Sequence, residues 1–149
     1  MIMNKYSTLC LVYTDTCNAN CSICSFECSP HKSNKMNVED AKTYIDEAVE
    51  CAGVSRLAIT GGEALLYYDE ILQVINHAYK RGLYVTCNSN GYWARTLDET
   101  GIKMLNLIKA GLKQITISVD QYHMQYIPIE NIRNIITAAK RLQLHVVLE

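Results

Sequence analysis

Residues 53–60, GVSRLAIT, place a glycine directly before a short run of strand-forming residues. The same arrangement recurs in residues 82–86, GLYVT, and residues 111–118, GLKQITIS. The three glycines stand 29 residues apart (82 minus 53 and 111 minus 82), and each follows a helix-like stretch. A glycine at a helix end suits a left-handed residue. The spacing therefore indicates a repeated strand–helix unit.

Two more β-rich segments, residues 9–14 and 144–148, extend this repeat at its ends. Four segments between the expected strands carry apolar residues at helical spacing. Those residues are Val38, Ala41, Ile45 and Ala48; Ile71, Val74, Ile75 and Ala78; Ile102, Leu105 and Ile108; and Ile132, Ile135, Ala139 and Leu142. Asn37 and Asp98 are expected N-caps, and Pro128 suits the first turn of the last helix.

The resulting order, βαβαβαβαβ, predicts an α/β fold with a parallel sheet and outer helices. No G-x-G-x-x-G phosphate loop follows the first strand, as an open nucleotide-binding sheet would require. A complete eightfold barrel needs about 250 residues, or about 31 per unit, which is close to the observed spacing. We therefore predict that residues 1–149 form one core, a partial (βα) barrel whose last strand is left as an edge.

The composition is that of an ordinary globular domain, with 49% hydrophobic and 19% charged residues in 149. Fourteen basic and 15 acidic side chains give a formal net charge of -1, which provides no field to attract nucleic acid. No apolar run approaches the roughly 20 residues of a membrane span, and no leader is evident. We expect a cytoplasmic protein that binds neither nucleic acid nor membrane.

Seven cysteines are present, and three of them form a C-x3-C-x2-C motif at Cys17, Cys21 and Cys24. An odd number of cysteines in a reducing compartment indicates a metal or cluster site rather than disulfides. Three thiolates suit an iron–sulfur cluster with one open iron. They also suit structural zinc if Cys28 or His31 supplies a fourth ligand. The spacing alone leaves both interpretations open.

A second motif, TGGE at residues 60–63, ends the second expected strand. Active sites of parallel α/β sheets are built at this end of the strands. Two adjacent glycines allow a ligand to approach the backbone closely, and the carboxylate of Glu63 would suit an ammonium group. A plain flexible turn is the ordinary alternative.

The cysteine motif after the first strand and Gly-Gly-Glu after the second resemble the radical S-adenosylmethionine (SAM) family. The resemblance covers nearly the whole chain and implies a partial TIM-like barrel with a 4Fe-4S cluster and SAM as cofactors. It implies that Cys17, Cys21 and Cys24 ligate the cluster. The backbone of Ile23 would then pack near the adenine of SAM.

The resemblance also assigns the remaining contacts to SAM. It implies that Gly61, Gly62 and Glu63 receive the ammonium group of the methionine moiety. Ser89, after the third expected strand, resembles the hydroxyl that faces the SAM carboxylate, and Ser118 the one that faces the ribose.

The function implied is reductive cleavage of SAM to a 5′-deoxyadenosyl radical, which abstracts hydrogen from a substrate. The substrate is a small molecule or a peptide, and a flavodoxin or ferredoxin is the expected kind of electron donor. Asp120 and His123, just beyond the fourth strand, are candidate catalytic residues because loops at that end are often functional. An apolar barrel interior is expected to contain the radical.

Two departures from the family pattern keep other functions open. Ala64 stands where family members commonly have proline, and a full family core has six units, so this chain is expected to be truncated after the fifth strand. One alternative is a zinc-stabilised module without redox chemistry. The other is a catalytically incomplete fragment, or one completed by pairing its edge strand with another subunit.

Overall fold

The computed structural model of the protein describes residues 7–149, in which strands and helices alternate as predicted. Within these residues the strands are β1 (Thr8–Val12), β2 (Arg56–Thr60), β3 (Tyr84–Ser89), β4 (Leu112–Ile117) and β5 (His145–Leu148). The α-helices are α1 (Val38–Glu47), α2 (Tyr68–Lys80), α3 (Leu97–Ala110) and α4 (Ile129–Leu142). Shorter helical turns are η1 (Ala48–Ala52, a π-helix), η2 (Ala64–Tyr67) and η3 (His123–Gln125), the last two being 3-10 helices.

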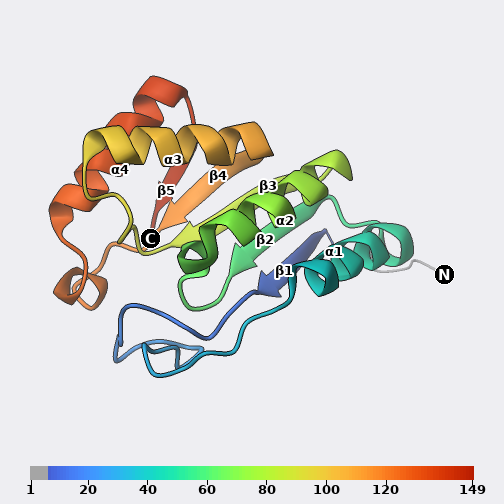
Figure 1. The fold of residues 1–149 in the computed structure, drawn as a ribbon, viewed down its shortest axis with the longest axis horizontal. Coiled ribbons are helices and arrows are strands. Elements are labelled where there is room, and N and C mark those ends of the chain that lie inside the picture. The colour runs from blue at the N-terminus through green and yellow to red at the C-terminus, as the bar shows by residue number, and fades with distance from the viewer. Residues whose placement is uncertain (1–6) are drawn as a thin grey trace.

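The strands form a parallel sheet in the order β1-β2-β3-β4-β5. Right-handed crossovers between strands in this order return every helix to the same side of the sheet. Each α-helix accordingly contacts the next one, and Figure 1 shows the helices as a layer along the sheet. This is the arc of a (βα) barrel rather than a doubly wound sheet, which confirms the predicted fold class.

The two faces of the sheet carry different side chains, because successive residues of a strand point to opposite faces. One row in register across the sheet faces the helices and is apolar: Leu11, Ile59, Cys87, Ile115 and Val146. The adjacent row faces away from the helices: Cys10, Ala58, Thr86, Gln114 and His145. The face away from the helices is the interior of the barrel. Because this second row is mostly polar, the expectation of an apolar interior is wrong for it.

The helix ends agree with the glycine repeat. Gly53, Gly82 and Gly111 all have positive φ values, of 61°, 83° and 118°. The last helix ends without a glycine, because Gln143 itself adopts a left-handed conformation with φ 56°.

The helix starts agree only in part. Asn37 caps α1, since its side chain accepts a hydrogen bond from the backbone N–H of Glu39 at 2.8 Å. The prediction for Asp98 is wrong: the N-cap of α3 is Thr96, so Asp98 lies inside the first turn. Pro128 is the residue before α4 rather than part of its first turn.

The buried face of α3 also differs from the prediction. Ile102 and Leu105 are 62% and 38% exposed, whereas Met104 and Leu107 are fully buried. The helix begins earlier than expected, and its packing against α2 and α4 selects a neighbouring stripe of residues. Apolar spacing indicated a helix here but did not identify its buried face.

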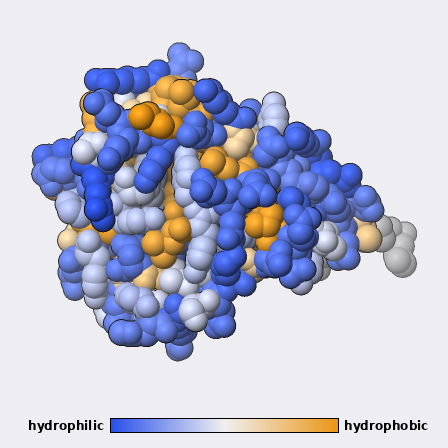
Figure 2. Space-filling view, viewed as in Figure 1, coloured by the Kyte–Doolittle hydropathy of each residue, from blue (hydrophilic) through white to orange (hydrophobic). Residues whose placement is uncertain are grey.

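The surface seen in Figure 2 is mainly hydrophilic, with several separate hydrophobic patches. None of the helices between residues 7 and 149 has the length and apolar character needed to cross a lipid bilayer.

Candidate active site

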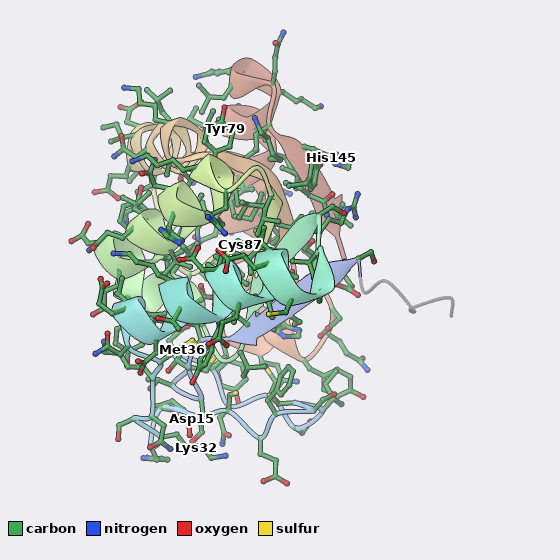
Figure 3. The ribbon with its side chains drawn as sticks, turned by 90° about the vertical axis from the view of Figure 1, so that its right-hand side faces the viewer. Asp15, Lys32, Met36, Tyr79, Cys87 and His145 are labelled. Carbon is green, nitrogen blue, oxygen red and sulfur yellow. The ribbon has the colours of Figure 1, made fainter. Side chains whose placement is uncertain are left out.

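The cysteine motif lies in a long loop between β1 and α1, at the carboxyl edge of the sheet. Hydrogen bonds across its neck close this loop: the Met36 N–H donates to Tyr13 O at 2.7 Å and the Asp15 N–H to Asn34 O at 3.1 Å. The Asp15 carboxylate also accepts from the Asn34 amide at 2.7 Å. Figure 3 shows Asp15 and Lys32 in this loop, at the end of the molecule opposite His145. The cysteines are therefore carried by a loop with a fixed base.

The carboxylate of Glu70, on α2, holds the base of the same loop against that helix. The Glu70 carboxylate accepts hydrogen bonds from Tyr13 Oη at 2.5 Å and from Lys35 Nζ at 2.7 Å. These contacts, the one from Lys35 first, hold the pKa of Glu70 below its usual value. The hydroxyls of Thr16 and Tyr67 lie 3.2 Å apart, so the residue before the first cysteine is also anchored.

The two glycines after β2 lie against the start of the loop. The Gly62 N–H donates to Thr14 O at 2.7 Å, and the Glu63 N–H donates to Thr16 O at 2.9 Å. A Cβ atom on Gly61 would lie 2.4 Å from Thr14 O, and one on Gly62 would lie 2.1 Å from Thr16 O. The close approach that these glycines permit is therefore first of all an approach of the chain's own backbone.

Glu63 is completely buried, and its carboxylate points into the protein. Its oxygens accept hydrogen bonds from Ser89 Oγ at 3.0 Å, from the Asn90 N–H at 2.7 Å and from the Leu65 N–H at 3.2 Å. Burial raises the pKa of Glu63 to about 7, although these hydrogen bonds lower it. The structure thus brings the predicted residues Glu63 and Ser89 together and directs the carboxylate away from solvent.

Ser89 uses its hydrogen-bonding capacity inside the protein. Its hydroxyl donates to Glu63 and accepts from Trp93 Nε1 at 2.9 Å and from the Gly91 N–H at 3.1 Å. A serine hydroxyl offers one donor and two acceptor positions, so all three are occupied. Ser118 is different: only its backbone N–H is engaged with β3, on Ser89 O at 3.1 Å, and its partly exposed side chain borders the pocket described next.

A pocket of about 380 Å³ opens at this edge. The predicted site residues that line it are Cys17, Cys21, Ile23, Cys24, Gly61, Gly62, Ser89, Ser118, Asp120 and His123. Glu63 does not line it. The pocket therefore gathers all but one of the candidate residues from the ends of β1, β2, β3 and β4.

The cysteines that line this pocket are partly buried at positions 17, 21 and 24 and buried at Cys28. Burial raises the pKa of Cys17 and Cys21, and it raises that of Cys28, next to Cys24, to about 11. Thiol ligands bind metals as thiolates, so a bound cationic group must displace their protons.

The geometry of the donors can be compared with the two metal interpretations. Nowhere in residues 7–149 do three or more His, Cys, Asp or Glu side chains form a group placed to hold one metal ion. The thiolates of a 4Fe-4S cluster bind different iron atoms, so they surround a larger body. Three thiols on one loop around a shared pocket fit a cluster by residue type and by position.

Asp120 and His123, just beyond β4, form a hydrogen-bonded pair that borders the pocket. Asp120 Oδ2 lies 2.7 Å from His123 Nδ1, and Oδ1 accepts from the backbone N–H groups of Tyr122 and His123. Desolvation raises the pKa of Asp120, but its hydrogen bonds with His123 and Tyr122 outweigh this and leave the pKa below its usual value. The same segment reaches the cysteine loop through Tyr126 Oη, which donates to Asn20 O at 2.8 Å.

Sequence reasoning missed several residues that build this site. Asn90 contacts both Cys17 and Asn18, and Tyr67 and Tyr126 anchor the loop. Residues 89–91 have the sequence SNG, and the family resemblance assigns a role only to the serine. An asparagine directly after a strand end is the signal that was available for Asn90.

Comparisons with known proteins agree with this architecture. The family model of the Radical SAM superfamily matches residues 11–147. The "Probable GTP 3',8-cyclase" of Pyrobaculum aerophilum is 36% identical over 115 residues, covering 72% of this chain and 37% of that protein. The "Putative peptide biosynthesis protein YydG" of Bacillus subtilis is 27% identical over 128 residues, covering 84% of this chain and 39% of that protein. The chain thus spans less than two fifths of the length of either relative.

Two solved structures share the fold. BtrN, in complex with AdoMet and 2-DOIA, superposes with a TM-score of 0.67 at 13% identity, over 97% of this chain and 57% of BtrN. Methylornithine synthase (PylB) gives a TM-score of 0.66 at 14% identity, over 96% of this chain and 44% of PylB. The family match over nearly all described residues and the partial barrel lead to the same conclusion. The chain belongs to the radical SAM superfamily, a family of enzymes that use a 4Fe-4S cluster together with SAM.

Proposed function

We propose that this chain carries the SAM-cleaving site of a radical SAM enzyme, with Cys17, Cys21 and Cys24 as the ligands of the 4Fe-4S cluster. One observation carries the proposal: these three thiols line a single pocket together with Gly61 and Gly62. When bound, the cluster and SAM supply one-electron cleavage of the carbon–sulfur bond of SAM and a 5′-deoxyadenosyl radical.

The protein's own residues orient SAM and exclude water. We assign the ammonium group of SAM to the peptide groups of Gly61 and Gly62, and the ribose to the hydroxyl of Ser118. Ile23, exposed at the tip of the loop, covers the adenine. Glu63 acts from behind this surface: its carboxylate accepts a hydrogen bond from Ser89, which fixes the ends of β2 and β3 relative to each other.

Asp120 and His123 are proposed to act together on the substrate. The carboxylate of Asp120 faces Nδ1 of His123, which directs the other ring nitrogen, Nε2, toward a different partner. A neutral imidazole held in this way accepts a proton or hydrogen bond at Nε2. We therefore propose that His123 orients a substrate N–H or O–H group and that Asp120 fixes the ring.

The substrate is proposed to be a small molecule or a peptide, with reduction by a flavodoxin or ferredoxin. Among the described residues that line the pocket, none is a lysine or arginine. Phosphate groups are usually bound by such cations. This supports a peptide over a nucleoside triphosphate for the part of the site that this chain builds.

The test is anaerobic reconstitution with iron and sulfide, reduction with dithionite, and assay of 5′-deoxyadenosine released from SAM. We expect a brown protein in which Cys21→Ala abolishes cluster binding and product release, whereas Cys28→Ala retains the cluster. A SAM-induced change in the electron paramagnetic resonance (EPR) spectrum of the reduced cluster reports SAM binding even without turnover. A colourless protein with one zinc, lost in Cys28→Ala, would instead support the zinc module.

A further inference from the structure

We propose that Asn90 is a positioning residue for the cluster: its side-chain amide donates a hydrogen bond to Cys17 Sγ and makes the cluster easier to reduce. This inference rests on the proposed cluster at Cys17, Cys21 and Cys24. It concerns a residue that neither the cysteine motif nor Gly-Gly-Glu contains.

The orientation of the Asn90 amide follows from its partners. Oδ1 accepts a hydrogen bond from the Tyr92 N–H at 3.0 Å, which leaves Nδ2 to face the cysteine loop. Nδ2 donates to Asn18 Oδ1 at 3.0 Å and lies 3.8 Å from Cys17 Sγ. Exchanging the two amide atoms would place Nδ2 against a backbone donor and Oδ1 against Asn18 Oδ1. The observed orientation therefore gives each amide atom a suitable hydrogen-bond partner. Asn90 is only 6% exposed, and buried polar groups are almost always hydrogen-bonded.

The backbone of Asn90 is fixed as firmly as its side chain. Its N–H donates to the buried Glu63 carboxylate at 2.7 Å. Asn90 thus connects the end of β3, the turn after β2 and the first cysteine of the loop. Small movements of Cys17 relative to the sheet are opposed by a residue that contacts both.

The sulfur atoms of the three cysteines are not equivalent in their hydrogen bonds. Cys17 Sγ accepts from the Ala19 N–H at 3.4 Å as well as from Asn90, and Cys24 Sγ accepts from the Cys28 N–H at 3.4 Å. The Cys21 thiol instead faces Tyr122 O at 3.9 Å. Of these donors, the Asn90 amide is the one that a side-chain substitution removes without altering the loop backbone.

A donor to a ligating sulfur stabilises the more negative, reduced form of a cluster more than the oxidised form. Hydrogen bonds to the sulfurs are among the factors that set the reduction potential, and contacts behind the ligands orient them. Loss of the Asn90 amide should therefore make the cluster harder to reduce.

The experiment is an EPR-monitored redox titration of the reconstituted protein and three variants. In Asn90→Ala we expect the ratio of reduced to oxidised cluster at a fixed potential to fall about threefold, a shift of about 28 mV to more negative potential. Asn90→Asp, nearly the same size, replaces the donor with a negative charge and should shift further in the same direction. Asn18→Ala removes the neighbouring contact but leaves the amide on Cys17, so its potential should match that of the unmodified protein.

A spectroscopic measurement tests the contact directly. In protein labelled with ¹⁵N-asparagine, pulsed EPR of the reduced cluster should show a nitrogen coupling that Asn18→Ala retains and Asn90→Ala loses. If Asn90→Ala folds poorly by circular dichroism, Asn90→Asp provides the same test. Unchanged potentials in both Asn90 variants would overturn this inference alone. An unmodified protein that binds no iron would overturn the proposed function and this inference with it.

Discussion

The interface between sheet and helices and the carboxyl edge of the sheet are held together in different ways. At the interface, apolar side chains such as Leu57, Ile59 and Ile115 are fully buried against the helices. At the carboxyl edge, backbone groups of the cysteine loop and of the turn after β2 are paired directly, and Glu63 lies buried among polar partners. Apolar packing spreads its stabilisation over many contacts, whereas each contact at the edge involves specific atoms. We therefore expect the interface to determine stability and the edge to determine function.

The largest effect is expected from Gly62→Ala, which places one methyl group at the edge. Its Cβ would lie 2.1 Å from Thr16 O, so the loop that carries the cysteines must move. Overpacking of this kind costs about 1–3 kcal/mol, and we expect most of the iron-binding capacity to be lost. The measurement is the iron and sulfide content after reconstitution.

Gly101→Ala is the matched control for this variant. A Cβ on Gly101, inside α3, would meet nothing within 4 Å. Alanine should stabilise the helix by up to about 1 kcal/mol and leave the iron content unchanged. Full iron loading in Gly62→Ala would show that the loop tolerates displacement at this point.

The sequence predicted the interface better than the edge. The glycine spacing and the β-rich runs located the strands, apolar residues at helical spacing located the helices, and residue type identified the N-cap Asn37, because each of these signals lies within one element or its end. They did not identify the buried stripe of α3, where Met104 rather than Leu105 is buried, because that stripe depends on how neighbouring helices pack. The pairing of Asn90 with Cys17 joins residues 73 positions apart, and no local pattern reports such a contact.

Ile115→Ala tests the interface, and its expected effect on iron binding is smaller than that of Gly62→Ala. The side chain is fully buried on the helix-facing side of β4, and removing it should lower the free energy of unfolding by about 2–5 kcal/mol. His145→Ala, on the other face of the sheet and exposed, should change it by no more than about 0.5 kcal/mol. Urea unfolding measures both. Folded Ile115→Ala should still bind the cluster, and loss of iron from the folded variant would show that interface and edge are coupled.

Glu63→Gln tests the buried carboxyl group at the edge through its pH dependence. The native pKa of about 7 lies above the ordinary value of 4.5, so the native state binds the proton more tightly than the unfolded chain does. The free energy of unfolding of the unmodified protein should therefore fall as pH rises from about 4.5 to 7, by at most about 3 kcal/mol. Glutamine carries no such proton, so the variant should not show this contribution.

The measurement is urea unfolding of the iron-free, reduced protein at several pH values between 4.5 and 8. The difference between Glu63→Gln and the unmodified protein isolates Glu63 from the other titrating groups. The free energy of unfolding of Glu63→Gln, relative to that of the unmodified protein, should rise with pH and level off above pH 7. Parallel curves would mean that Glu63 is ionised in the native state throughout this range.

Lys35→Ala should have the smallest effect, because it removes a contact on the outer side of the edge. Lys35 pairs with Glu70 at 2.7 Å, but both side chains are about one third exposed, and such ion pairs contribute about 0–1 kcal/mol. If that contribution holds the loop closed, a chelator should remove iron from the reconstituted protein faster, by about fivefold at most.

Lys42→Ala breaks a pair of the same length within α1 and should leave this rate unchanged. High salt weakens exposed ion pairs, so it should raise the rate of the unmodified protein toward that of Lys35→Ala. Equal rates for both lysine variants would assign closure of the loop to its backbone hydrogen bonds.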